Sequence, residues 1–303
     1  MIVIGTRGSA LALAQTEWTK SRILARFPGA EISLKIIKTS ADRDQTSSIR
    51  SGSSVGVFVK ELEQALTNRE IDIAVHSMKD VPTRTPEGLT IVAIPEREDP
   101  RDALIANNGK RLSELPPGSV IGTGSVRRQA QILALRPDIN VKDLRGNVDT
   151  RLKKLHDGLY DAIILACAGL NRLGYQHHIT EPLAFEQMLP APGQGAIAIE
   201  TRSDDTGAQQ AVAFLNNQHT AITVTAERAF LQRMGGGCNV PVAVHARIKG
   251  NLIEIEGLVA SADGKRIIRE FARQDLESAN IMAIDLADRI LNQGGREILE
   301  EIS

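Results

Sequence analysis

The chain has 303 residues and a formal net charge of −1, with 42% hydrophobic and 24% charged residues. This length favours two or three domains over a single core, and the near-neutral charge argues against a nucleic-acid-binding or membrane-surface protein, since both usually carry a basic excess. The first residues lack the apolar length and basic leader of a signal peptide, the longest apolar stretch is about half a membrane-spanning helix, and two cysteines make no disulfide framework. We therefore expect a cytoplasmic protein.

The first half of the sequence contains the same pattern of elements twice. In the first copy the expected elements are a strand over residues 1–5, a turn over Gly5-Thr6-Arg7-Gly8-Ser9, a helix over 10–27, a strand over 31–38, a helix over 57–68 and a strand over 71–76. In the second copy they are a strand and a similar turn over 119–125, a helix over 126–135, a strand over 139–144, a helix over 148–157 and a strand over 161–165. The apolar run that ends each copy is typical of a strand buried on both faces of a parallel sheet. The repeat predicts two doubly wound α/β domains of the periplasmic-binding-protein type.

The rest of the chain contains a second crossover and a different pattern of elements. Candidate crossovers lie near residues 95–100 and 189–195, and a further apolar run over 196–199 follows the second. Beyond it we expect a helix over 221–233, a hairpin with strands over 253–259 and 266–271 around Asp263-Gly264, and a closing helix over 278–292. The predicted domains are one α/β domain of residues 1–95 and 196–217, a second of 96–195, and a smaller α+β domain of 218–303.

Two turns of similar sequence, Gly5-Thr6-Arg7-Gly8-Ser9 and Gly122-Thr123-Gly124-Ser125, are candidate anion sites. Each ends a strand and opens a helix, so backbone N–H groups and the positive end of a helix dipole converge there. Arg7 and Ser9 belong to the first turn, and Ser125, Arg127 and Arg128 to the second. Arginine grips carboxylates and phosphates bidentately. The alternative is that these are surface arginines paired with neighbouring acids.

Further cations follow later strands. Arg145 and Arg172 come after strands whose carboxyl ends lie at the ligand-binding edge of an open α/β sheet. Arg151 is a less specific candidate, because a solvated helix residue is an equally good interpretation.

A second candidate site follows the strand over 71–76, which delivers Ser77, Lys79 and Asp80 to the edge of the first sheet. A carboxylate beside a lysine can stabilise a developing cation and move protons. A helix N-cap acid beside a lysine explains Asp80 equally well. We interpret His76 as a packed strand residue. His177-His178 lacks companions at metal-ligand spacing, so no metal site is expected.

The two cysteines have different surroundings. Three glycines precede Cys238 and leave its thiol uncrowded, which suits a tethering or nucleophilic sulfur. Cys167 lies in an apolar run and is expected to be a small buried residue of a strand. No His–Cys signature accompanies Cys238, so a protease is a weak interpretation.

Several motifs follow one another in a fixed order along the chain. They are Gly5-Thr6-Arg7-Gly8-Ser9-Ala10-Leu11-Ala12, Phe58-Val59-Lys60-Glu61-Leu62-Glu63, Ala74-Val75-His76-Ser77-Met78-Lys79-Asp80-Val81-Pro82, Arg97-Glu98-Asp99-Pro100-Arg101-Asp102-Ala103, Arg127-Arg128-Gln129, Leu144-Arg145-Gly146-Asn147, Pro190-Ala191-Pro192-Gly193-Gln194-Gly195-Ala196 and Gly236-Gly237-Cys238-Asn239-Val240-Pro241. Together they resemble the porphobilinogen deaminase family, also called hydroxymethylbilane synthase, over essentially the whole chain.

The resemblance implies a three-domain transferase of heme and tetrapyrrole biosynthesis. Such an enzyme condenses four porphobilinogen units, with loss of ammonia, onto a dipyrromethane cofactor and releases linear hydroxymethylbilane by hydrolysis. By the same matching, Cys238 holds the cofactor through a thioether, and Asp80 binds pyrrole N–H groups and stabilises cationic azafulvene-like intermediates. The other implied contacts are Lys79, Ser125, Arg127, Arg128 and Arg145 for the cofactor, and Arg7, Ser9, Ser77, Thr123, Arg151, Arg172 and Gln194 for the substrate. We expect a monomer that acts on a small molecule, without a nucleic-acid or membrane partner.

The sequence departs from the family pattern at two places. Ser53-Ser54-Val55-Gly56 stands where a glycine-rich loop usually carries a lysine, so Val55 replaces that lysine. Gly124 stands where a second hydroxyl residue often precedes the serine that matches Ser125. Neither change involves Asp80 or Cys238.

The main alternative is a non-enzymatic two-domain anion-binding protein, since solute-binding proteins share the two-domain α/β plan. That alternative predicts a secretion signal, no use for Cys238 and reversible release of the ligand. A regulatory ligand-sensing module is a weaker alternative, because no DNA-binding helix pair or basic segment is evident.

Overall fold

The structure is a computed structural model that describes residues 1–37, 59–235 and 240–301. The chain divides into two compact units. Unit 1 comprises Met1–Glu98 and Gly195–Ala221, and unit 2 comprises Asp99–Gln194 and Ile222–Ser303. Cys238, and the loop in which Val55 replaces the family's lysine, lie outside the described residues.

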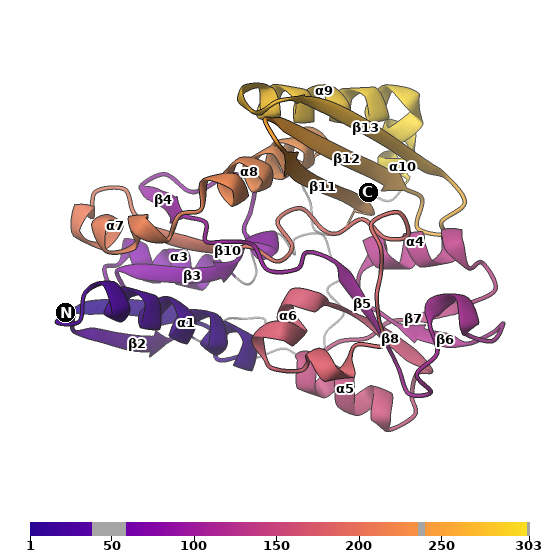
Figure 1. Ribbon diagram of the computed structural model, residues 1–303, viewed down its shortest axis with the longest axis horizontal. Helices are drawn as coiled ribbons and strands as arrows, with labels where there is room; N and C mark the ends of the chain where they lie inside the picture. Colours follow the sequence, from indigo (N-terminus) through magenta and orange to yellow (C-terminus); the bar gives the residue numbers. More distant parts are fainter. Residues whose placement is uncertain (38–58, 236–239, 302–303) are drawn as a thin grey trace. The chain divides into compact units, whose positions relative to one another are not determined.

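A five-stranded sheet with strand order β2-β1-β3-β10-β4 forms the centre of unit 1 (Figure 1). Its strands are β1 (Ile2–Thr6), β2 (Ile32–Ile36), β3 (Ile73–Ser77), β4 (Leu89–Ala93) and β10 (Ile197–Arg202). β1 pairs in parallel with β2 and β3, whereas β10 pairs antiparallel with β3 and β4. The sheet is therefore mixed rather than purely parallel, because the returning chain enters it as β10 in the opposite direction.

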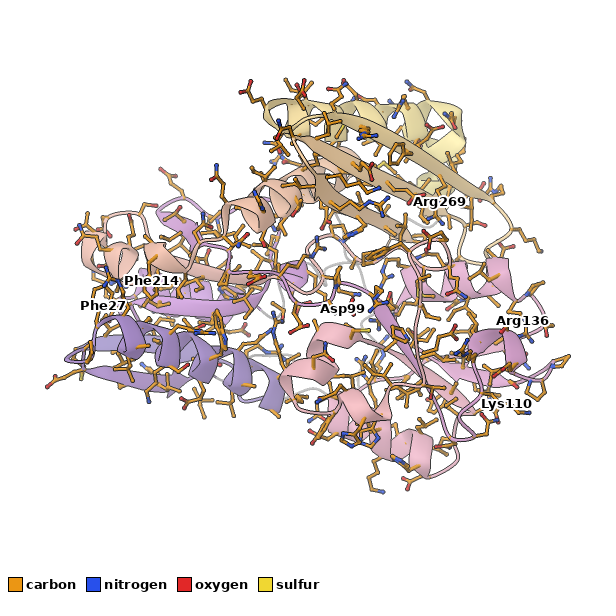
Figure 2. The ribbon with its side chains drawn as sticks, viewed as in Figure 1. Phe27, Asp99, Lys110, Arg136, Phe214 and Arg269 are labelled. Carbon is orange, nitrogen blue, oxygen red and sulfur yellow. The ribbon has the colours of Figure 1, made fainter. Side chains whose placement is uncertain are left out.

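Helices cover both faces of this sheet. They are α1 (Ala10–Arg26), α3 (Lys60–Thr67), the 3-10 helix η1 (Met78–Asp80), α7 (Thr206–Val212) and the 3-10 helix η4 (Ala213–Leu215). Ile23 of α1 and Val212 of α7 share one buried cluster with the strands, and Leu62 of α3 belongs to a second cluster that includes Ala74. Phe27, the C-cap of α1, lies edge to face with Phe214 of η4 at 5.9 Å between ring centroids (Figure 2).

Unit 2 contains a second mixed sheet, with strand order β7-β6-β8-β5-β9. Its strands are β5 (Asp102–Ala106), β6 (Val120–Gly122), β7 (Asn140–Lys142), β8 (Ala162–Ala166) and β9 (Glu181–Pro182). β6 is parallel to β7 and β8, and β5 is antiparallel to β8 and β9. The three parallel strands of each sheet are those of the predicted repeat, and the antiparallel strands are additions that the repeat did not predict.

The helices of this sheet correct one local expectation. They are α4 (Val126–Leu135), α5 (Val148–His156), α6 (Cys167–Arg172) and the 3-10 helices η2 (Leu112–Glu114) and η3 (Gln176–His178). Cys167 begins α6, so it is a buried helix residue and not a strand residue. Apolar residues continue from β8 into α6, so the periodicity of the sequence does not show where the strand ends and the helix begins.

The last part of the chain forms a three-stranded antiparallel sheet with its own helices. The elements are α8 (Gln218–Arg233), β11 (Val242–Lys249), β12 (Leu252–Ala260), β13 (Ile267–Asp275), the 3-10 helix η5 (Leu276–Ser278), α9 (Ala279–Ile290), the π-helix η6 (Leu291–Gly295) and α10 (Arg296–Glu300). The predicted hairpin is confirmed, and Gly264 adopts the left-handed φ of 70° in its turn. α9 lies along this sheet (Figure 1). Arg269 of β13 donates to the carbonyl oxygens of Phe185 and Glu186 (Figure 2).

The fold class is confirmed by these three sheets, two of them in α/β layers and one in a smaller α+β arrangement. The predicted boundary between a second and a third domain stays a prediction, since both regions belong to unit 2. None of the helices in the described part of the chain is both long and apolar enough to span a membrane.

Candidate functional site

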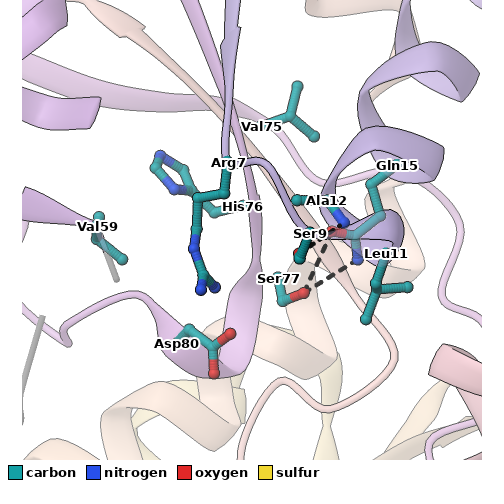
Figure 3. Close-up of a pocket in the computed structure, with 10 residues that line it drawn as sticks. All are labelled: Arg7, Ser9, Leu11, Ala12, Gln15, Val59, Val75, His76, Ser77 and Asp80. Atoms are coloured by element: carbon teal, nitrogen blue, oxygen red, sulfur yellow. Dashed lines mark hydrogen bonds between the residues drawn. The ribbon is translucent and has the colours of Figure 1, made fainter. Parts of the chain in front are cut away.

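A pocket in unit 1 brings together four of the predicted site residues (Figure 3). Arg7 and Ser9 come from the turn between β1 and α1, and Ser77 and Asp80 come from the end of β3 and from η1. The residues that line the pocket are Arg7, Ser9, Leu11, Ala12, Gln15, Val59, Val75, His76, Ser77 and Asp80. The chain thus gathers at one place residues that are about 70 positions apart in sequence, as expected at the carboxyl ends of adjacent parallel strands.

Arg7 and Asp80 give the pocket one cation and one anion. In Figure 3 the guanidinium group of Arg7 points toward the carboxylate of Asp80. Asp80 is the last residue of η1 and is partly buried. It is therefore not a helix N-cap acid, which removes the alternative interpretation of this residue. Lys79 precedes it on η1 and is also partly buried.

The serines of the pocket have defined partners. Ser9 is the N-cap of α1, and its hydroxyl accepts the backbone N–H of Ala12 at 3.3 Å. Ser77 Oγ contacts both amide atoms of Gln15, at 3.0 Å from Nε2 and 3.3 Å from Oε1. Gln15 was not predicted as a site residue, although a buried glutamine on the apolar face of an expected helix is a signal that could have drawn attention to it.

In unit 2, a buried aspartate joins three other predicted site residues. Asp102 Oδ2 lies 2.7 Å from Arg127 Nη1, and Asp102 Oδ1 lies 2.6 Å from Arg128 Nη2 and 2.9 Å from Gln194 Nε2. The side chain of Asp102 has no exposed surface. Asp102 belongs to one of the sequence motifs but was not predicted as a site residue. Only the fold shows that β5 places it beside the arginines of α4.

The charges of this Asp102 cluster do not cancel. Burial alone would raise the pKa of the Asp102 carboxyl, but the two guanidinium groups outweigh burial and hold that pKa well below its usual range. Arg127 also donates to the carbonyl oxygen of Leu189 at 2.7 Å, and Arg128 to that of Ile164 at 3.1 Å. Two arginines against one aspartate leave an excess of one positive charge in a buried place, which suits a carboxylate ligand.

The second turn, Gly122-Thr123-Gly124-Ser125, forms between β6 and α4 as predicted. Ser125 is the N-cap of α4, and its hydroxyl accepts the N–H of Arg128 at 3.5 Å. The hydroxyl of Thr123, which is buried, accepts the N–H of Ser125 at 3.2 Å. These contacts fix the turn that carries Arg127 and Arg128.

The remaining arginines of unit 2 lie in partly exposed settings. Arg145 Nε lies 2.7 Å from Asp143 Oδ2, with side-chain exposures of 39% and 60%. Arg151 donates from Nε to the carbonyl oxygen of Gly146 at 2.8 Å. Arg172 ends α6 and is partly buried. Arg145 is thus paired with a neighbouring acid, as the alternative of surface arginines predicted. Exposed ion pairs of this type are weak, so a ligand carboxylate can take the place of Asp143.

The cysteine predictions have separate outcomes. Cys238 lies outside the described residues, so its role stays a prediction. Burial, followed by the charges of Asp99 and Asp102, raises the pKa of the Cys167 thiol to about 12, so this residue is an unreactive thiol at neutral pH.

Within residues 1–37, 59–235 and 240–301, His, Cys, Asp and Glu form no group of three or more that could hold a metal ion.

Comparison with known proteins finds two family models that together match most of the chain. Residues 2–210 match the family model described as porphobilinogen deaminase, dipyromethane cofactor binding domain, and residues 221–292 match porphobilinogen deaminase, C-terminal domain. The chain is 49% identical to the porphobilinogen deaminase of Thermus thermophilus over 100% of this chain and 99% of that one. It is 48% identical to the porphobilinogen deaminase of Pelobacter propionicus over 99% and 96%.

Proposed function

Because the chain belongs to the porphobilinogen deaminase family, whose members are transferases of porphyrin and heme biosynthesis, we propose that it is a hydroxymethylbilane synthase. It condenses four porphobilinogen units one after another and releases the linear tetrapyrrole by hydrolysis. Each addition breaks the bond between the aminomethyl carbon and nitrogen of porphobilinogen and forms a bond from that carbon to the free α-carbon of the chain. Ammonia leaves, and the α-carbon loses its proton.

The observation that carries this proposal is the pocket of unit 1, in which Arg7 and Asp80 lie together with Ser77. Loss of ammonia leaves positive charge on a pyrrole ring whose N–H group is a hydrogen-bond donor. A carboxylate can accept that N–H and stabilise the charge at the same time. Asp80 has the right chemistry for both tasks, and Arg7 can hold a carboxylate side chain of the same ring.

The residues of unit 2 fit a cofactor that carries carboxylates. A dipyrromethane, when bound, supplies the free α-carbon to which the first porphobilinogen is added. The excess positive charge of the Asp102 cluster, from Arg127 and Arg128, would hold its acidic side chains. Arg145 and Ser125 would add further contacts, and Cys238 would hold the group through a thioether. Lys79, a residue of unit 1, is also assigned to the cofactor.

The substrate itself demands many fixed cations. Each porphobilinogen ring brings an acetate and a propionate, and a protein with a formal net charge of −1 must bind them through local clusters. We assign Arg7, Arg151 and Arg172 to these carboxylates, with Ser9, Thr123 and Gln194 in support. We place the reaction in the cytoplasm and expect a monomer, with no nucleic-acid or membrane partner.

Intact-mass measurement combined with turnover tests the proposal. The purified wild-type protein is expected to carry one dipyrromethane adduct and to convert porphobilinogen to hydroxymethylbilane. Cys238→Ala removes the adduct and the turnover, since the chain has lost its attachment point. Asp80→Asn keeps the adduct but loses turnover by about 100-fold or more, as expected for a group that acts on the reacting ring.

Glu87→Gln is the matched control, because Glu87 is an exposed acid of the same unit. It should keep both the adduct and the turnover. An unmodified wild-type protein that is well folded and binds anions reversibly would instead support the non-enzymatic alternative. Full turnover in Asp80→Asn would contradict the role given to Asp80.

A further inference from the structure

A buried hydrogen-bonded pair, His76 and Glu200, lies next to the pocket of unit 1. His76 Nε2 is 2.9 Å from Glu200 Oε2, and the exposed fractions of the two side chains are 3% and 0%. His76 also lines the pocket, whereas Glu200 does not. A carboxylate oxygen accepts hydrogen bonds, so a bond from the imidazole to Glu200 uses the hydrogen on Nε2.

Sheet register places His76 between Arg7 and Glu200. β1 and β3 are paired with Gly5 opposite Ala74, and continuing this parallel register by two residues puts Arg7 beside His76. On the other side of β3, His76 is opposite Ala198 of β10, and Glu200 is two residues further on the same face. Both His76 and Arg7 line the pocket drawn in Figure 3.

This face of the sheet is the one that α3 covers. A Cβ added at Gly5 would meet Leu62 of α3, and Ala74 packs in the same cluster as Leu62. Glu63 of α3 has its pKa raised, first by burial and then by the negative charge of Glu200, while His76 opposes the rise. His76 and Glu200 therefore lie between the sheet and α3, where little water reaches them and the surrounding side chains restrict their movement.

Stability does not explain the pair. Five backbone partners already join β3 to β10. The second oxygen of Glu200, Oε1, is buried without a hydrogen-bond partner in the described part of the chain. A buried ion pair with an unsatisfied oxygen often stabilises a fold less than apolar residues of the same volume would, and such groups beside a pocket are candidates for function.

We infer that Glu200 is a positioning residue of this pocket: it fixes the imidazole of His76, and the imidazole in turn holds the side chain of Arg7 in the direction of Asp80. The inference deepens the proposed function, since Arg7 is the residue to which we assign a substrate carboxylate. Its consequence is that Glu200 governs affinity for the acidic side chain of the pyrrole more than the bond chemistry at Asp80.

The test replaces the pair by apolar residues and measures binding directly. The probe is a pyrrole that carries acetate and propionate side chains but no aminomethyl group, so it binds without reacting. Calorimetry on the purified protein should give a Kd about tenfold weaker for the double variant His76→Leu with Glu200→Leu. Glu200→Gln keeps an acceptor for Nε2–H and should stay within about threefold of wild type.

A control and a second variant separate positioning from general destabilisation. Asp205→Asn removes one charge from the ion pair between Asp205 and Arg202, which does not line the pocket, and keeps the N-cap of α7. It should leave Kd unchanged even if the melting temperature falls. If the leucine pair does not fold, Glu200→Ala takes its place, because truncation removes the carboxylate without adding volume.

Turnover distinguishes this inference from the proposed function. In a working enzyme, the leucine pair or Glu200→Ala should raise the KM for porphobilinogen by about tenfold and change kcat less. If the wild-type protein does not turn over porphobilinogen, the proposed function fails while the binding result still decides the role of Glu200. Unchanged Kd in the leucine pair, or in Glu200→Ala if that variant is used, would overturn the inference.

Discussion

Asp102 shows how one carboxylate can organise several side chains that belong to different elements. It accepts hydrogen bonds from Arg127, Arg128 and Gln194, and all four residues are buried. The guanidinium groups neutralise the carboxylate, and the carboxylate fixes their direction. The cluster is therefore held in a fixed geometry, at the cost of a large desolvation, and we propose that it binds an acidic ligand.

Asp102→Asn tests this dependence. The change leaves two buried guanidinium groups without their counter-charge, so we expect the free energy of unfolding to fall by about 3–5 kcal/mol. Denaturant unfolding monitored by circular dichroism measures it. Asp99→Asn is the matched control, since Asp99 pairs with Arg101 in a partly exposed setting and should cost less than about 1 kcal/mol. Equal losses in the two variants would contradict the role of Asp102.

Glu63 gives a second residue-scale prediction, on pH. Because its folded-state pKa is raised by burial and by Glu200, the unfolded carboxyl ionises first as pH rises above 4.5, while the folded one keeps its proton. Wild-type stability therefore falls as pH rises through this window. Glu63→Gln cannot ionise and should melt at a higher temperature than wild type at pH 7–8, with the advantage shrinking toward pH 4. An advantage independent of pH would show that ionisation is not the cause.

At the scale of elements, the turn between β6 and α4 depends on a close approach of two backbone segments. A Cβ added at Gly124 would lie 2.9 Å from the carbonyl oxygen of Leu144 and 3.2 Å from Asp143 Oδ1. The loop that follows β7 therefore packs directly against this turn, with no room for a side chain at position 124 unless the loop moves. The same loop carries Arg145.

Gly124→Ser should therefore destabilise this protein although it restores the family's usual residue. The backbone of Leu144 must move to accept the side chain, and we expect a loss of about 1–3 kcal/mol in unfolding free energy. Gly29→Ser is a suitable comparison, because a Cβ there meets nothing within 4 Å. Thermal melting of both variants makes the measurement, and a neutral result at Gly124 would mean that the loop adapts freely.

At the scale of the whole molecule, the chain leaves unit 1 after Glu98 and re-enters it at Gly195. The returning segment inserts β10 between β3 and β4. It also places Glu200 opposite Ala74, on the face of the sheet that α3 covers. The sheet of unit 1 is complete only when β10, about 100 residues later in the chain, has joined it. The surroundings of the pocket therefore include residues that are far from it in sequence. This explains why a substitution at Glu200 can alter a site formed by the first 80 residues.

Local sequence features were sufficient for a large part of this fold. Ser9 and Ser125 each cap a helix at the predicted turn, and the apolar runs at residues 73–77 and 162–166 form buried strands. These outcomes depend on backbone capping and on burial of continuous apolar runs, both of which act over a few neighbouring residues. The order of motifs along the chain was also sufficient to predict the family.

Other features were decided only by tertiary structure. The antiparallel direction of β5 and β10, the helix that begins at Cys167, and the partners Gln15, Asp102 and Glu200 were not predicted. Each depends on a contact between segments far apart in sequence, and a polar residue gives no local sign of which distant group will neutralise it. The sequence by itself determined which residues are assigned to the chemistry, Arg7 and Asp80 above all, and the motifs that contain them. Tertiary structure decided which distant groups pair inside the fold, His76 with Glu200 and Asp102 with Arg127, because only the folded sheets bring those groups within hydrogen-bond distance.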